Sequence, residues 1–295
     1  MIGLAVALYP AIHAVIAARV KATCVAVDEK WLTLKQQWHY WYVGLDEATG
    51  LPLVSLLLPT RTTWSCCWVM VTLKRLGQAP QAIITDGLAS YASAIPAVFP
   101  KAKHLLCLFH HQQGVLRWLQ EHAATFPEAT VTTLKQKMKA VVQTCDPRTV
   151  RRRLQRLTDE DAEQSWGLTT WLMQTWTCLD RLLPALRHNQ YPRTTNAIER
   201  FFRAFQRFYK TRGGFHSVVS AHRELMLFIV VYVFTIQVGT GSAPIECIVP
   251  EANTMPFYRI LNDPFRYGLA HMCHVNPGLS TLVATPAGPL QLARP

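Results

Sequence analysis

The sequence predicts an α/β fold: a mixed five-stranded sheet flanked by helices and interrupted by an all-helical insertion. Strand-like runs rich in Val, Ile and aromatic residues alternate with helical stretches in the order β-β-β-α-β-α-β as far as Phe109. From His110 to about Leu186 the strand signals vanish and helix formers dominate. A strand that follows a crossover helix runs parallel to its neighbour, whereas a short turn gives an antiparallel pair, so the sheet should contain both kinds of pairing.

The first three strands are expected to form an antiparallel meander. Cys24–Leu32 (CVAVDEKWL) alternates small and β-branched residues, and Gln37–Asp46 is aromatic and rich in strand formers. The turn Glu47–Gly50 then leads into Leu51–Leu58. The first of these strands carries an acidic residue, Asp28, whose burial would require a partner, either backbone donors at a strand end or a metal ion.

The rest of the sheet alternates with helices. Thr62 or Thr63 can cap the first of these helices, and Gly77 lies beyond its end. A short apolar strand then stops at an acid, Asp86. In chain order the predicted elements are a helix at Thr62–Leu76, a strand at Pro80–Asp86, a helix at Leu88–Ala97 and a strand at His104–Phe109.

Beyond the fifth strand, helices are expected almost throughout. Thr194, Thr195 or Asn196 can cap a helix that Gly213-Gly214 ends, and Ser217–Val238 is a further long helix. The domain organisation that follows is an N-terminal helical stub at 1–22, the first part of the sheet core at 23–111, and a helical insertion at 112–186. The second part of the core is at 187–238, and a loosely ordered tail rich in Pro and Gly is at 239–295.

Composition points to a polyanion as partner. The formal net charge of the 295-residue chain is +12, which favours nucleic acid over a membrane surface. None of the eight cysteines forms a CxxC pair, which argues against a zinc ribbon and suits reduced thiols in a cytosol. The apolar run Met1–Ala18 lacks a basic leading region and contains Pro10, and Leu225–Val238 is short for a membrane span, so both are expected to be helices of the fold.

Two acids are expected to meet at one edge of the sheet. In the predicted topology the first and fourth strands are neighbours, so Asp28 and Asp86 can point at the same place. Two adjacent carboxylates repel one another, and Mg²⁺, which prefers hard oxygen ligands, removes that conflict. Glu199 on a helix packed against the sheet would supply a third carboxylate, and a pair of ions held in this way can activate water or a 3′-hydroxyl toward a phosphodiester.

These motifs resemble those of the DDE transposases of bacterial insertion sequences, which have a ribonuclease-H-like core. ITDGLASYASAI resembles the stretch around their second acid, and TTNAIERFFRAFQRFYKTRGGF resembles the helix that carries their glutamate. The long interval between Asp86 and Glu199 and the motif Cys107-Leu-Phe-His110 are similar to the Mutator-like and related groups, which have a helical domain inserted there. The similarity runs from about Cys24 to Val238 and implies a ribonuclease-H-like fold.

The resemblance also implies a function. The expected enzyme cuts and joins transposon DNA ends, with Asp28, Asp86 and Glu199 as catalytic and metal-binding residues and two Mg²⁺ ions, for which Mn²⁺ can substitute. The expected partners are transposon ends, target DNA and further copies of the chain in a homodimer or higher oligomer. The expected location is the bacterial cytoplasm at the nucleoid, without membrane association. Because no helix-turn-helix region precedes the first strand, two alternatives stay open, namely an inactive remnant that only binds DNA and a ribonuclease-H-like nuclease.

Further residues are candidates for supporting roles. Cys107 and His110 are expected to be structural residues near the site, since two ligands alone make a poor zinc centre. Asp46 and Glu29 are rival acids, but Asp46 falls at a turn and Glu29 should face the other side of its strand. Trp166 is a candidate for stacking on a base. Two arginine-rich helical clusters can hold DNA phosphates or can simply be solvated: Arg148, Arg151, Arg152, Arg153 and Arg156, and then Arg200, Arg203, Arg207 and Lys210.

Overall fold

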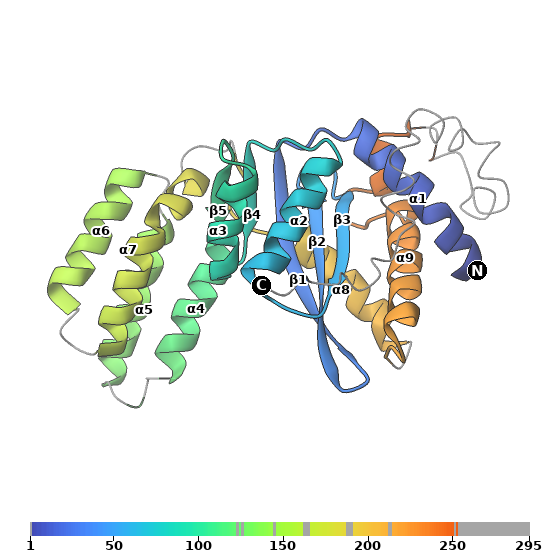
Figure 1. Ribbon diagram of the computed structural model, residues 1–295. Helices are drawn as coiled ribbons and strands as arrows, with labels where there is room; N and C mark the ends of the chain where they lie inside the picture. The colour runs from blue at the N-terminus through green and yellow to red at the C-terminus, as the bar shows by residue number, and fades with distance from the viewer. Residues whose placement is uncertain are drawn as a thin grey trace, which may run out of the picture.

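A mixed five-stranded sheet forms the centre of the protein. The computed structural model describes residues 2–121, 124, 127–143, 146–161, 166–186, 191–211, 214–250 and 252. The strands lie in the order β3-β2-β1-β4-β5, which is the predicted ribonuclease-H-like arrangement, and helices flank the sheet (Figure 1). The predicted fold class is therefore confirmed. The strands are β1 (Cys24–Leu34), β2 (Gln37–Asp46), β3 (Pro52–Leu58), β4 (Ala82–Thr85) and β5 (Lys103–Leu106).

Strand β1 is the axis of the sheet because it pairs in both senses. It runs antiparallel to β2 along its whole length, and its first residues run parallel to β4. Val25, Ala26 and Val27 are fully buried, as expected of a central strand covered on both faces. A two-residue turn at Lys35 and Gln36, both at positive φ, joins β1 to β2, and the resulting hairpin projects beyond the rest of the sheet (Figure 1).

Helices cover both faces of the sheet. In Figure 1, α2 (Thr63–Arg75) and α3 (Ala89–Val98) lie in front of it and α8 (Asn196–Lys210) lies behind it, with α9 (Val218–Phe234) alongside. Thr62 caps α2, as its sequence predicts, by accepting a hydrogen bond from the Ser65 N–H at 3.3 Å.

Aromatic packing fastens α8 and α9 to β2. The Trp41 ring is fully buried and lies 4.6 Å from the Phe205 ring and 6.0 Å from the Phe228 ring, centre to centre. The Trp41 indole N–H donates to the Ser55 hydroxyl at 2.8 Å, so its polar atom is satisfied as well. This cluster fixes the helix that carries Glu199 against the sheet.

The N-terminal segment forms a helix of the fold, as predicted. Helix α1 (Ile2–Arg19) packs against α9, and its buried His13 hydrogen-bonds the Leu53 carbonyl at 2.8 Å. None of the helices in the described part of the chain combines the length and the hydropathy that a membrane-spanning segment needs. At the other end, the short helix η3 (Pro244–Cys247) buries Ile245 in the main core, and most of the predicted loose tail lies outside the described residues.

The helices between β5 and α8 gather around a second hydrophobic core. Leu134, Leu154 and Leu172 are buried in that core and come from three different helices. Throughout the described part of this segment the elements are helical, while the predicted limits of 112–186 stay a prediction. The predicted fifth strand ends earlier than expected, because the chain already turns into a helix at Leu108. The helices are α4 (Leu108–Glu121), α5 (Glu128–Gln143), α6 (Pro147–Asp161) and α7 (Trp166–Leu186).

Replacing Trp41 by Ala should lower the free energy of unfolding by about 3–5 kcal/mol, because it leaves a large cavity between β2, α8 and α9. Trp38 is the matched control on the same strand, since its side chain is 56% exposed. Trp38→Ala should change the same quantity by less than about 1 kcal/mol. Chemical denaturation of both variants checks this, and equal losses would contradict the packing described here.

Candidate active site at the carboxyl ends of the parallel strands

Asp28, Asp86 and Cys107 lie level with one another where the parallel pairing of strands β1, β4 and β5 ends. Ala26 pairs with Ile84 in the β1–β4 register, and two further steps bring Asp28 level with Asp86. Thr85 pairs with Leu106 in the β4–β5 register, so the next step brings Asp86 level with Cys107. The carboxyl ends of parallel strands are where open α/β sheets bind ligands.

A group of three carboxylates forms at this edge. Oxygen atoms of Asp28, Glu29 and Asp86 all lie within 4.8 Å of one another. Arg61, in the loop between β3 and α2, holds two of them together, because its Nε donates to Glu29 and its Nη2 lies 3.5 Å from Asp86 Oδ2. The Tyr91 hydroxyl on α3 donates to the other oxygen of Glu29 at 3.1 Å. This group is a donor set of hard oxygens with one cation beside it.

The expectation that Glu29 points away from the Asp28 site was wrong. Neighbouring residues of a strand do alternate between its faces, but the Glu29 side chain is long enough for its carboxylate to come within 4.8 Å of Asp28 and Asp86. Arg61 and Tyr91 hold it there. Neither partner is close to Glu29 in the sequence, so the contact could not be read from the strand pattern.

Burial and like charge make Asp28 reluctant to ionise. Burial, together with the nearby carboxylates of Asp86 and Glu29, raises the pKa of the Asp28 carboxyl to about 8. The Glu29 N–H, which donates to Asp28 Oδ1 at 2.8 Å, and the charge of His110 act in the opposite direction. The pKa of Glu29 is also raised, chiefly by burial, and Arg61 offsets part of that rise. An additional cation would therefore relieve an electrostatic conflict here.

A second group of possible metal ligands contains Glu199. Ligand atoms of Cys107, His110 and Glu199 lie within 4.8 Å of one another. The buried Thr195 connects them: its hydroxyl lies 3.2 Å from Cys107 Sγ, 3.4 Å from His110 Nδ1 and 3.4 Å from Glu199 Oε1. Thr195 also precedes α8, so this group ties the first turn of the Glu199 helix to the end of β5.

The Cys107 and His110 side chains shift one another toward their charged forms. Their hydrogen bond raises the pKa of His110 to about 9 against the effect of burial. Burial raises the pKa of the Cys107 thiol, but hydrogen bonds with His110 and Thr195 outweigh burial and lower it overall. These shifts favour the charged forms of both side chains, while the structural role that the sequence predicts for them stays a prediction.

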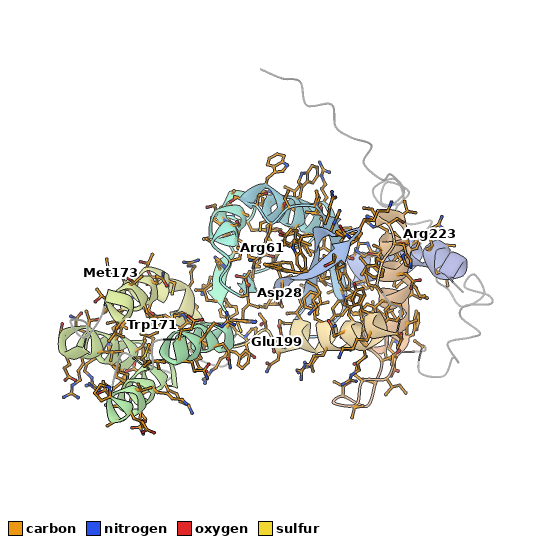
Figure 2. All side chains as sticks on the ribbon, turned by 90° about the horizontal axis from the view of Figure 1, so that it is seen from below. Asp28, Arg61, Trp171, Met173, Glu199 and Arg223 are labelled. Carbon is orange, nitrogen blue, oxygen red and sulfur yellow. The ribbon has the colours of Figure 1, made fainter. Side chains whose placement is uncertain are left out.

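His110 joins the two groups. Its Nε2 lies 4.0 Å from Glu199 Oε1, and it also interacts electrostatically with Asp28 and Asp86. Figure 2 accordingly shows Asp28, Arg61 and Glu199 together in the middle of the molecule. The structure thus brings Asp28 and Asp86 into one group and places Glu199 in the adjoining one.

The other candidates lie elsewhere. Asp46 accepts hydrogen bonds from the backbone and hydroxyl of Thr49, which is the local turn role expected of it. The side chain of Trp166 lies outside the described residues. The two basic clusters are exposed on helices, one on α6 (Arg148, Arg151, Arg152, Arg153 and Arg156) and one on α8 (Arg200, Arg203, Arg207 and Lys210).

The sequence interpretation named Thr195 only as a candidate helix cap and did not propose Arg61, Tyr91 or Thr195 as residues of the site. Thr195 stands four residues before Glu199 in the motif that singled out the glutamate, so its position was a usable signal. Arg61 and Tyr91 lie in a loop and in a short helix whose relation to β1 only the packing reveals.

Asp28→Asn should stabilise the metal-free protein at pH 8. The carboxyl keeps its proton in the folded state up to a pKa of about 8 but loses it near pH 4 when unfolded, so its contribution to stability falls as the pH rises between these values. Tm measured in EDTA should therefore be higher for the variant at pH 8, and the two values should converge toward pH 4. Equal Tm values at pH 8 would contradict the burial of this charge.

Thr195→Val should lower the free energy of unfolding by about 1–3 kcal/mol, because the hydroxyl that joins Cys107 and Glu199 is lost in a buried place. Thr195→Ser keeps the hydroxyl and should lose less. Urea denaturation of both variants measures the difference, and a Val variant as stable as the Ser variant would show that the hydrogen bonds contribute little.

Comparison with known proteins gives a family match and a match to a solved structure. Residues 60–232 match the family described as Transposase, Mutator family. A cryo-EM structure titled as the simian T-cell lymphotropic virus intasome in complex with PP2A regulatory subunit B56 gamma matches at 13% identity and a TM-score of 0.26, over 53% of this chain and 49% of that chain. No curated protein matches. The family match covers more than half of the sequence, and the chain therefore belongs to the Mutator family of transposases.

Proposed function

We propose that this transposase is a DDE-type enzyme that cuts DNA at transposon ends and joins the freed 3′-hydroxyl to target DNA. The observation that carries the proposal is the register that sets Asp28 level with Asp86, with Glu199 adjoining through His110. In the cleavage step the oxygen of a water forms a bond to phosphorus, and the bond from phosphorus to the 3′-oxygen breaks. That oxygen leaves as the hydroxyl, which attacks a target phosphodiester in the same way.

The residues present fit magnesium. Asp28, Glu29 and Asp86 offer hard oxygen donors within 4.8 Å of one another, and the raised pKa of Asp28 marks a place where negative charge lacks compensation. Bound there and at Glu199, two Mg²⁺ ions would supply Lewis-acid stabilisation of the attacking and leaving oxygens. The chain's own contribution is to hold the carboxylates in place, which Arg61 does for Glu29 and Asp86 and Thr195 does for Glu199.

DNA would lie along α8. Arg200, Arg203, Arg207 and Lys210 recur at helical spacing and are exposed, and the first of them follows Glu199 directly. Cations at this spacing can contact successive phosphates while one phosphodiester reaches the carboxylates. Binding would then be mainly electrostatic.

The α6 cluster is a weaker DNA-binding candidate. Arg151 lies 3.3 Å from an Asp180 carboxylate oxygen, and the Arg156 Nε donates to Glu160 at 2.8 Å, so part of its charge is already paired within the helical unit. The proposal also includes assembly of several copies of the chain on DNA. It places the protein at the bacterial nucleoid.

Two rival functions differ from this one in what they produce. A remnant that only binds DNA would not nick a duplex in Mg²⁺, and a ribonuclease-H-like nuclease would nick without giving joined products. Incubating the protein with labelled duplex and plasmid target, with and without EDTA, separates the three.

Glu199→Gln should abolish nicking of a labelled duplex in Mg²⁺ while leaving Tm and DNA affinity in place. The change preserves size and helix propensity but removes a charge needed at the metal-bridged transition state, so the rate should fall by several orders of magnitude. DNA affinity should persist or rise, because one negative charge that faces phosphate is gone. Gel shift and thermal melting are the accompanying measurements.

Glu224→Gln on α9 is the matched control. It makes the same chemical change, but Glu224 belongs to neither group of ligand atoms found among the described residues. It should retain nicking. A Glu199 variant that cuts at the wild-type rate would remove Glu199 from the site, whereas a folded Glu224 variant that is equally inactive would show that the loss is not specific to Glu199.

A further inference from the structure

An aromatic cluster stands exposed on the projecting β1–β2 hairpin. Trp31 is 49% exposed and Trp38 is 56% exposed. Their ring centres lie 5.7 Å apart in an edge-to-face arrangement, and the Tyr40 ring also lies edge-to-face with Trp31, at 5.6 Å. The antiparallel register explains the contact, because Trp31 pairs with Tyr40 and Trp38 is the next residue on the same face. The neighbouring aromatic rings hold Trp31 in place and leave about half of its surface free.

Cationic side chains lie near this cluster. Between Lys30 and Leu45 the sequence contains two lysines and neither Asp nor Glu. Arg61 lies over the Trp31 ring, 5.4 Å from its centre. Exposed aromatic rings among cations suit nucleic acid, whose bases stack on the rings and whose phosphates meet the cations.

The same arginine links the cluster to the carboxylates. While its guanidinium lies over Trp31, it also donates to Glu29 and approaches Asp86 Oδ2 to 3.5 Å. Trp31 follows Glu29, a member of the carboxylate group, by two residues on the same face of β1, a separation of about 7 Å along an extended strand. That is of the order of the distance between a phosphodiester and a base one or two nucleotides away in a single strand.

We propose that Trp31, held by Trp38, Tyr40 and Arg61, is a stacking site for an unpaired nucleobase next to the phosphodiester that is cut. The placement of that phosphodiester rests on the function proposed above, whereas the stacking itself does not. The ligand class is a single-stranded nucleotide of any sequence, because every base offers a flat π surface to an aromatic ring. Base pairs adjoining the cut would then open when DNA binds.

The test compares two labelled DNA probes in EDTA, where no cutting takes place. One is a blunt duplex, and the other is the same duplex with a short single-stranded 3′ overhang that contains 2-aminopurine. Trp31→Ala should weaken binding of the overhang probe about tenfold and leave the blunt probe unchanged. Trp31→Phe keeps an aromatic ring and should restore most of the lost affinity. The wild type should quench 2-aminopurine fluorescence on binding, and the Ala variant should not.

Trp64→Ala is the matched control, since Trp64 is 71% exposed on α2 and forms its own edge-to-face pair with Trp68. It should bind both probes as the wild type does. An equal loss for Trp64→Ala, an equal loss on both probes, or failure of Trp31→Phe to recover affinity would overturn the proposal. The proposal would also fail if sedimentation showed that Trp31→Ala separates a dimer while the variant still prefers the overhang probe. The aromatic cluster would then contact a second copy of the chain. If the probe experiments support stacking on Trp31 but the Glu199→Gln variant still cuts DNA, only the catalytic assignment of Glu199 is refuted.

Discussion

The structure depends on the registry of three parallel strands. Because β1, β4 and β5 end at a common edge, residues far apart in the chain come level there, Asp28 beside Asp86 and Asp86 beside Cys107. Hydrophobic side chains enforce this registry: each strand is buried on both faces at this point, and a slip of one residue would turn every side chain to the opposite face. The position of the site is thus a consequence of core packing, and the polar residues there occupy an edge that the core defines.

Burial brings several carboxylates together at that edge, and their mutual repulsion is only partly compensated by the protein's own cations. Arg61 neutralises Glu29 and approaches Asp86, while Asp28 has no cationic side chain in direct contact among the described residues. The hydrogen bond with Cys107 helps to raise the pKa of His110 to about 9, which favours a positively charged ring near the carboxylates. A divalent cation, as proposed above, would compensate the remaining negative charge, of which Arg61 already compensates a part.

The sequence predicted much of the fold because its signals are local. The meander, the crossover helices and the change to an all-helical segment follow from periodicity and turn residues, and the strand order follows from connection rules. Asp28, Asp86 and Glu199 could be proposed from the sequence because each lies on a regular element or directly after one, with a recognisable neighbourhood. The position of the Glu29 carboxylate was predicted wrongly. Alternation along a strand predicts the face from which the Cβ atom projects, but it does not predict where the end of a long side chain lies. Arg61 comes from a loop, where no periodicity exists to place it.

A backbone hydrogen bond fastens the two ends of the helical segment between β5 and α8 to each other. The Leu108 N–H, at the start of α4, donates to the Arg193 carbonyl at 2.9 Å, just before α8. The chain therefore leaves the sheet core and returns to it at almost the same point, and the described helices between these points enclose their own apolar interior as a closed excursion. Because the two ends are fastened to each other, the excursion can lengthen, shorten or be exchanged between relatives without moving the glutamate helix. Its contents are free to diversify toward new partners while the chemistry beside it stays unchanged.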